Sequence, residues 1–338
     1  MKAKNILLTA VLAVLFCPVA AGAAGVQKKA EPVPAASSPS SLQQSEPIYA
    51  ERGAETCMKC HDDTYKTKKG NKLLDILKSP HAVKSDGRTP FGPDNHDCET
   101  CHGASPQHIH SRPAPGQKRT EPTIVFNGPN ASPVAARNKM CLSCHQDTDH
   151  MDWQGSQHQS NNIACTDCHT VHVKKDPILV KKTQPEVCFT CHAEQRALTL
   201  QYSHHPIREG KVACSDCHNP HGSPGPHMLK KVRVTDLCYT CHADKRGPML
   251  WEHQPVREDC TNCHNPHGSV NPRLLKEKVP FLCFDCHAAT NDMGGVGVSA
   301  HSVAPGSSSF YLYGDRSCLS CHSQIHGSNS PSGSTFFR

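Results

Sequence analysis

The apolar residues of this chain are concentrated at its beginning and thinly scattered afterwards. Residues 6–19 form a largely apolar run behind the charges of Lys2 and Lys4, and small residues follow at 21–23. This pattern predicts a secretory signal peptide over residues 1–24. Residues 25–50 are rich in Pro, Ala, Ser and Gln and have little to bury, which predicts a flexible linker.

Beyond residue 50, neither helical nor strand periodicity is sustained. We expect short helices at segments such as 70–78 and 185–198, whereas the alternation typical of strands is nearly absent. Only 5% of the residues are aromatic, and the chain contains 27 Pro and 22 Gly. Such a composition cannot build an ordinary core from side chains. Another component has to supply the core.

Cysteine provides the regular pattern that the apolar residues lack. Of the 21 cysteines, 20 lie in ten copies of Cys-x-x-Cys-His, and Cys17 lies in the predicted signal peptide. Two cysteines three residues apart can form thioethers to one haem, and the adjacent histidine is then placed to bind its iron. Zinc ribbons and redox disulfides also use Cys-x-x-Cys, but neither requires the histidine every time. The sequence therefore predicts ten covalently bound c-type haems.

We number the motifs 1 to 10 along the chain and call their histidines proximal. The cysteines predicted to attach haem are Cys57, Cys60, Cys98, Cys101, Cys141, Cys144, Cys165, Cys168, Cys188, Cys191, Cys214, Cys217, Cys238, Cys241, Cys260, Cys263, Cys283, Cys286, Cys318 and Cys321. The predicted proximal iron ligands are His61, His102, His145, His169, His192, His218, His242, His264, His287 and His322. The predicted fold class is a multihaem cytochrome c, mostly loops with short α-helices and almost no β-sheet, whose core is formed by ten haems.

A second set of histidines follows the motifs in a repeating pattern. Each even-numbered motif has one histidine shortly before it and one shortly after it, so the unit is a two-haem repeat that occurs five times. We call these histidines distal and predict that they bind the second axial position of the irons. They are His81, His108, His158, His172, His205, His221, His253, His267, His301 and His326.

The spacing leaves some assignments open. His221 follows its proximal histidine by only three residues, too few to reach the opposite face of the same porphyrin, so we expect it to bind a neighbouring haem; the same holds for His267. Which iron each distal histidine binds is not readable from the sequence, and His110 competes with His108. The histidines outside the pattern, expected to be non-ligands, are His96, His110, His150, His204 and His227. No methionine recurs with the repeat.

A proximal and a distal histidine for every haem would leave no open coordination position, which an enzyme needs where substrate meets metal. This predicts an electron-transfer protein and not an enzyme. The alternatives are a soluble periplasmic multihaem electron carrier and a multihaem oxidoreductase of the nitrite or hydroxylamine type. The formal net charge of +6 does not indicate a nucleic-acid partner, because haem propionates add negative charge and attract Lys and Arg.

Several runs resemble the MtrA-type decahaem cytochromes, which include the MtoA, PioA and DmsE branches. They are residues 217–222, 246–253, 263–271 and 317–329, and the resemblance covers about residues 54–338. It implies an elongated wire made of two pentahaem modules, 51–200 and 201–338, held across the outer membrane inside a β-barrel porin. It also implies periplasmic or inner-membrane cytochromes as partners, with an extracellular multihaem cytochrome or extracellular metal as a further candidate. Such a wire serves Fe(II) oxidation or metal reduction, and the direction of flow is left open.

Overall fold

The computed structural model describes residues 46–67, 70–279, 281–287, 318–320, 322–331 and 333–336. The chain divides into two units, Met1–Glu46 and Pro47–Arg338, and nearly all described residues belong to the second. The predicted signal peptide, most of the predicted linker, His301 and Cys321 lie outside the described residues. The division into pentahaem modules stays a prediction.

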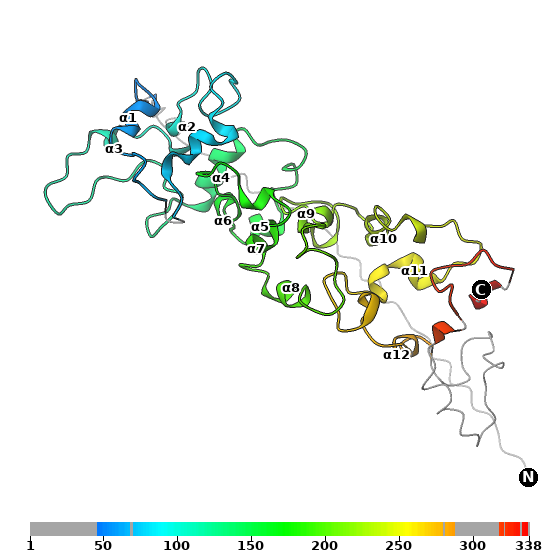
Figure 1. The fold of residues 1–338 in the computed structure, drawn as a ribbon. Helices are drawn as coiled ribbons and strands as arrows, with labels where there is room; N and C mark the ends of the chain where they lie inside the picture. The colour runs from blue at the N-terminus through cyan, green and yellow to red at the C-terminus, as the bar shows by residue number, and fades with distance from the viewer. Residues whose placement is uncertain are drawn as a thin grey trace, which may run out of the picture. The chain divides into compact units, whose positions relative to one another are not determined.

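The described chain consists of short helices joined by long stretches of coil (Figure 1). Its α-helices have between four and nine residues. They are α1 (Ala54–Met58), α2 (Cys98–His102), α3 (Pro106–His110), α4 (Val134–Leu142), α5 (Gln157–Ser160), α6 (Cys165–Cys168), α7 (Gln184–Cys188), α8 (Ala193–Leu198), α9 (Cys214–Cys217), α10 (Val234–Cys238), α11 (Gln254–Glu258) and α12 (Phe281–Phe284).

Short 3-10 helices supply most of the remaining regular structure. They are η1 (Leu73–Lys78), η2 (Pro80–Ala82), η3 (Pro177–Leu179), η4 (Pro226–Met228), η5 (Ala243–Lys245), η6 (Cys260–Asn262), η7 (Pro272–Leu274), η9 (Cys318–Ser320) and η10 (Gly333–Thr335). In the described ranges β pairing is limited to isolated bridges, such as Ser203 with Ser269 and Trp251 with Ser328. The predicted class of mostly loops with short helices and almost no sheet is confirmed.

The two predicted helical segments are shorter or tighter than expected. The segment 185–198 contains two helices, α7 and α8, because the turn of motif 5 interrupts it between Cys188 and His192. The segment 70–78 contains the 3-10 helix η1, whose first turn begins only at Leu73. Among the described residues no helix has both the length and the apolar character needed to cross a bilayer.

Few side chains are buried against one another. The buried apolar residues of the described part are Ile76, Phe91, Trp153, Ala164, Phe189, Ile207, Ala213 and Leu237. Eight such residues, two of them alanines, are far too few to offset the conformational entropy of ordering a chain of this length. The fold therefore requires a further source of apolar contact, as the composition indicated.

Candidate haem-binding array

Each Cys-x-x-Cys-His motif lies on a single helical turn. In motif 2 this turn is α2 itself. In the other nine motifs the backbone N–H of the proximal histidine donates to the carbonyl oxygen of the first cysteine, with N···O distances of 2.8–3.1 Å. In a helical turn, residues i, i+3 and i+4 share one face. Where the whole motif is described, its two cysteines and its histidine therefore face the same side, which suits attachment to one haem.

Odd and even motifs use opposite ends of their helices. The first cysteine of an odd motif lies at or near the end of a helix, namely α1, α4, α7, α10 and α12. The first cysteine of an even motif begins a helix, namely α2, α6, α9, η6 and η9. In each repeat a helix thus precedes the odd motif, whereas the even motif starts its own helix. This alternation matches the two-haem repeat in the sequence.

The proximal and distal histidines face one another in pairs. Nine proximal rings each lie opposite one distal ring, with ring centres 6.0–6.5 Å apart. The pairs are His61 with His108, His102 with His172, His145 with His81, His169 with His221, His192 with His158, His218 with His267, His242 with His205, His264 with His326, and His287 with His253. The tenth predicted distal histidine, His301, is outside the described residues.

This spacing is that of a metal held between two imidazoles. A bond between a metal and an imidazole nitrogen is about 2 Å long, so one metal bound on both sides sets the ring centres about 6 Å apart. The residues present therefore fit haem iron with two histidine ligands. The haem would add the large apolar surface that the chain lacks, and its iron would supply one-electron redox chemistry.

The facing histidines are oriented through their other ring nitrogen. In nine of the proximal and distal histidines Nδ1 lies 2.5–3.0 Å from a carbonyl or carboxylate oxygen. Such oxygens only accept, so Nδ1 carries the proton and Nε2 is left free for a metal. Some of these bonds cross between repeats: His158 donates to Pro220, and His205 donates to Pro266. The repeats are thereby joined through the facing histidines.

The Asn-Pro-His-Gly run after motif 6 forms a turn that places His221. The Asn219 side chain accepts from the backbone N–H of His221 at 3.2 Å. Gly222 has φ +114, and a Cβ there would clash with the carbonyl oxygen of Asp152. The same run after motif 8 repeats this arrangement at Asn265. Glycine is required because the turn packs against the backbone of an earlier repeat while its φ is left-handed.

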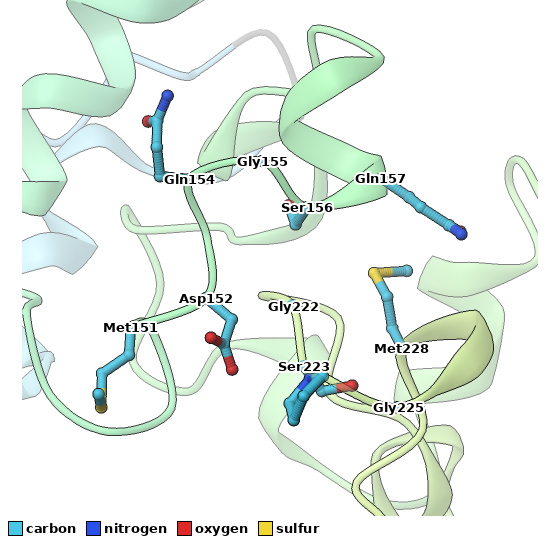
Figure 2. Close-up of a pocket in the computed structure, with 11 residues that line it drawn as sticks. Met151, Asp152, Gln154, Gly155, Ser156, Gln157, Gly222, Ser223, Gly225 and Met228 are labelled. Atoms are coloured by element: carbon cyan, nitrogen blue, oxygen red, sulfur yellow. The ribbon is translucent and has the colours of Figure 1, made fainter. Parts of the chain in front are cut away.

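A cleft of about 290 Å³ lies beside this contact. Figure 2 shows the loop with Met151 and Asp152 facing the loop with Gly222 and Met228. None of its described lining residues is a histidine or cysteine, so the cleft itself supplies no candidate haem ligand. It marks where two repeats meet.

Cysteines of consecutive motifs are neighbours throughout the array. The first cysteines of the two motifs in each repeat interact, as Cys57 does with Cys98, and this contact raises the pKa of the Cys98 thiol. The corresponding pairs are Cys141 with Cys165, Cys188 with Cys214, Cys238 with Cys260, and Cys283 with Cys318. Between repeats the links are Cys101 with Cys144, Cys168 with Cys188, Cys217 with Cys241, and Cys263 with Cys286. The attachment points therefore form one unbroken series from motif 1 to motif 10.

Burial keeps many of the facing histidines neutral, which is the form that binds metal. It lowers the pKa of His221 to about 4, and it also lowers the pKa values of His102 and His267. In each case loss of solvation of the charged imidazolium is the largest cause.

The histidines outside the pattern have other contacts. Both ring nitrogens of His204 have partners, Nδ1 with the Gln201 carbonyl at 2.8 Å and Nε2 with Glu209 at 3.5 Å. The ring of His96 stacks on Tyr49 at 3.5 Å. His110 is exposed, whereas its competitor His108 faces His61.

Two of the residues that contact the facing histidines were not anticipated from the sequence. His150 stacks on His221 with ring centres 4.2 Å apart and pairs with Asp147, and the carbonyl of His227 accepts from Nδ1 of His218. Neither belongs to the two-haem repeat, and no pattern in the sequence marks these contacts. A third such residue, Asp176, accepts from Nδ1 of His169.

Comparison with known proteins agrees with this geometry. Residues 204–247 and 253–292 match the family described as a doubled CXXCH motif, and residues 98–183 match the NrfB-like cytochrome c-type proteins. Multiheme cytochrome MtrA of Shewanella baltica is 39% identical over 285 residues, which is 84% of this chain and 81% of that protein. Cytochrome c-type protein NrfB of Haemophilus influenzae is 29% identical over 150 residues, 41% of this chain and 65% of that protein.

The motif turns, the facing histidines and these matches define a multihaem c-type cytochrome, a protein that binds haem covalently and transfers electrons. The long match to the S. baltica protein identifies the particular family. The chain belongs to the MtrA family of multihaem cytochromes.

Proposed function

We propose that this protein is a ten-haem wire that carries electrons across the outer membrane inside a porin. The observation that carries the proposal is the set of nine facing histidine pairs along one unbroken series of attachment points. Haem irons bound by histidine on both sides have no position for substrate, so such a site accepts and releases electrons only. A series of such sites makes a conductor.

Nine predicted distal histidines belong to the described pairs, and His301 is the remaining one. We assign His301 to the iron of motif 10, whose proximal ligand is His322. With this assignment every one of the ten haems has two histidine ligands. The oxidoreductase alternative requires at least one haem without a distal ligand, and this assignment leaves none.

The porin follows from the physical chemistry of the coil. Long stretches of backbone outside helices carry polar N–H and C=O groups that lipid cannot satisfy. Such a chain can cross a hydrocarbon core of about 30 Å only when another protein supplies the lipid-facing surface. We place the protein in the periplasm, bound to the outer membrane through this partner. There it would connect periplasmic or inner-membrane cytochromes with an extracellular cytochrome or metal.

A soluble periplasmic electron carrier is the second candidate, and the NrfB-like match over residues 98–183 favours it. Liposomes with a trapped redox dye and an external reductant separate the two. The wire predicts dye turnover only when cytochrome and porin are both present. Turnover with the cytochrome alone, or a stable complex without turnover, would contradict it.

A variant that lacks one haem tests whether the array must be continuous. Replacing Cys188 and Cys191 by alanine removes the haem attachment of motif 5, and this variant should bind the porin but lose dye turnover. The variant His204→Ala should retain turnover, because that histidine is engaged by Gln201 and Glu209.

A further inference from the structure

The proximal histidines of the even motifs differ in one hydrogen bond. Four of the five donate Nδ1–H to a backbone carbonyl: His102 to Ile124, His218 to His227, His264 to Arg273, and His322 to Thr335. In motif 4, His169 instead donates to the carboxylate of Asp176, with an Nδ1···Oδ2 distance of 2.8 Å. Within the described chain, this is the even motif whose proximal imidazole faces a full negative charge.

The exception has a local cause in the turn that follows the motif. In motifs 4, 6 and 8 a proline stands eight residues after the proximal histidine, at Pro177, Pro226 and Pro272. After motifs 6 and 8 the next residue is left-handed, His227 at φ 51 and Arg273 at φ 58, and its carbonyl accepts from the imidazole.

After motif 4 the corresponding residue, Ile178, is not among the residues with positive φ. The residue before the proline is Asp176 there, where the sister repeats have Gly225 and Asn271. The carboxylate thus takes the place of the carbonyl.

The carboxylate is held firmly in this position. Its oxygens also accept from the backbone N–H groups of Thr170 at 3.1 Å and Ile178 at 3.4 Å, and it caps η3. Its side chain is only 13% exposed. A fixed charge with little solvent contact is less screened than an exposed one, so it acts on the histidine at short range.

We propose that Asp176 tunes the haem of motif 4 to a lower reduction potential than its sister sites at motifs 6 and 8. This inference rests on the proposed function, because it requires His169 to be an iron ligand. A carboxylate acceptor shifts electron density onto the imidazole and raises its basicity. The more basic ligand stabilises ferric over ferrous iron, which lowers the potential. Asp176 is a positioning residue that acts through His169.

A lower potential at motif 4 means that an electron on this haem has a higher free energy than on the haems of motifs 6 and 8. An electron that enters the motif 4 site does so less favourably than at motifs 6 and 8. This site therefore stays oxidised longer than the sites of motifs 6 and 8 when the array is reduced.

Three variants of the holoprotein test the proposal by spectroscopic redox titration. Asp176→Asn keeps an oxygen acceptor and a good helix cap but removes the charge. It should raise the potential of one haem by at least about 59 mV, which corresponds to a tenfold change in the one-electron equilibrium of that haem. Asp176→Glu should restore the low potential. The control Asp216→Asn changes a carboxylate that binds the Ala213 N–H and Lys181 and does not bond an imidazole, so its shift should be much smaller.

A double variant shows which haem is affected. His221 faces His169, so His221→Met and Asp176→Asn should both raise the potential of the same haem. In the double variant one haem should therefore show both shifts. His267 faces His218 of motif 6, so Asp176→Asn combined with His267→Met should raise the potentials of two different haems.

The electron paramagnetic resonance spectrum of the ferric protein gives a second readout. One low-spin signal should shift its g values in Asp176→Asn and return in Asp176→Glu. An unchanged titration and spectrum in Asp176→Asn, with all haems still low-spin, would overturn the tuning role and leave the wire intact. A wild-type protein with a high-spin haem would instead overturn the closed array on which the tuning rests.

Discussion

The ring centre of His221 lies 6.1 Å from that of His169, two motifs earlier in the chain. The same relationship recurs between His267 and His218, and between His326 and His264. A histidine after an even motif thus faces the proximal histidine of the preceding even motif. Because each such pair joins two repeats, loss of one histidine should alter a haem that is attached elsewhere in the sequence.

Two adjacent histidines provide the sharpest test of the pairing. His205 faces His242 at 6.3 Å, whereas the neighbouring His204 has both ring nitrogens engaged by other groups. We expect His205→Ala to convert one haem to a high-spin form that binds carbon monoxide when reduced. His204→Ala should leave every haem low-spin. Optical and paramagnetic resonance spectra of the two purified variants decide this, and equal behaviour of the two would contradict the assignment.

Replacing a distal ligand by methionine should change a potential without releasing haem. In His267→Met the thioethers are untouched, so the covalent haem count should equal that of the wild type. A Met and His ligand pair raises the potential, and each 59 mV corresponds to about a tenfold change in the equilibrium of that site. Intact-protein mass and a redox titration measure the two quantities. If both were unchanged, His267 would not be a ligand.

Gly222→Ala should destabilise the contact between repeats. The residue has φ +114, and a Cβ would clash with the carbonyl oxygen of Asp152. A left-handed φ alone costs an alanine about 1–2 kcal/mol, and the clash adds to this. Gly155→Ala is the matched control, because Gly155 has φ +85 but a Cβ there would meet nothing within 4 Å. Thermal unfolding of the holoproteins should show a clearly larger loss for Gly222→Ala, and equal losses would argue against the close packing.

His301→Ala tests the tenth site. Nine distal histidines have facing partners, so removing His301 should leave one haem, that of motif 10, with an open position. His96→Ala is the control, because that ring stacks on Tyr49. One high-spin haem in His301→Ala and none in His96→Ala is the expected result of a spin-state measurement. Ten low-spin haems in His301→Ala would require another ligand for motif 10.

The sequence predicted the motifs and the candidate ligands because both depend on local spacing. Two cysteines and a histidine on one helical turn are fixed within five residues, and one distal histidine stands before and one after each even motif. The pairing could not be predicted, since it depends on which repeats touch. His108 faces the first motif of its own repeat, whereas His172 faces a motif of the previous one.

The role of Asp176 was missed for a related reason. An aspartate before a proline is typical of an ordinary turn or helix cap. Its contact with His169 becomes visible only when the turns after motifs 4, 6 and 8 are compared, with Asp176 standing where Gly225 and Asn271 stand in the sister repeats. The expected helical segment 185–198 is divided into two helices, because the turn of motif 5 interrupts it.

The proposed wire requires that each of the ten haem irons is bound by two histidines. Near-infrared magnetic circular dichroism of the fully ferric holoprotein reports the axial ligand pair of each haem, and it can be normalised to the covalent haem count from the intact mass. We expect ten haems per chain, all low-spin and all with two histidine ligands. Fewer than ten haems, or one equivalent of high-spin iron or of iron bound by histidine and methionine, would contradict it.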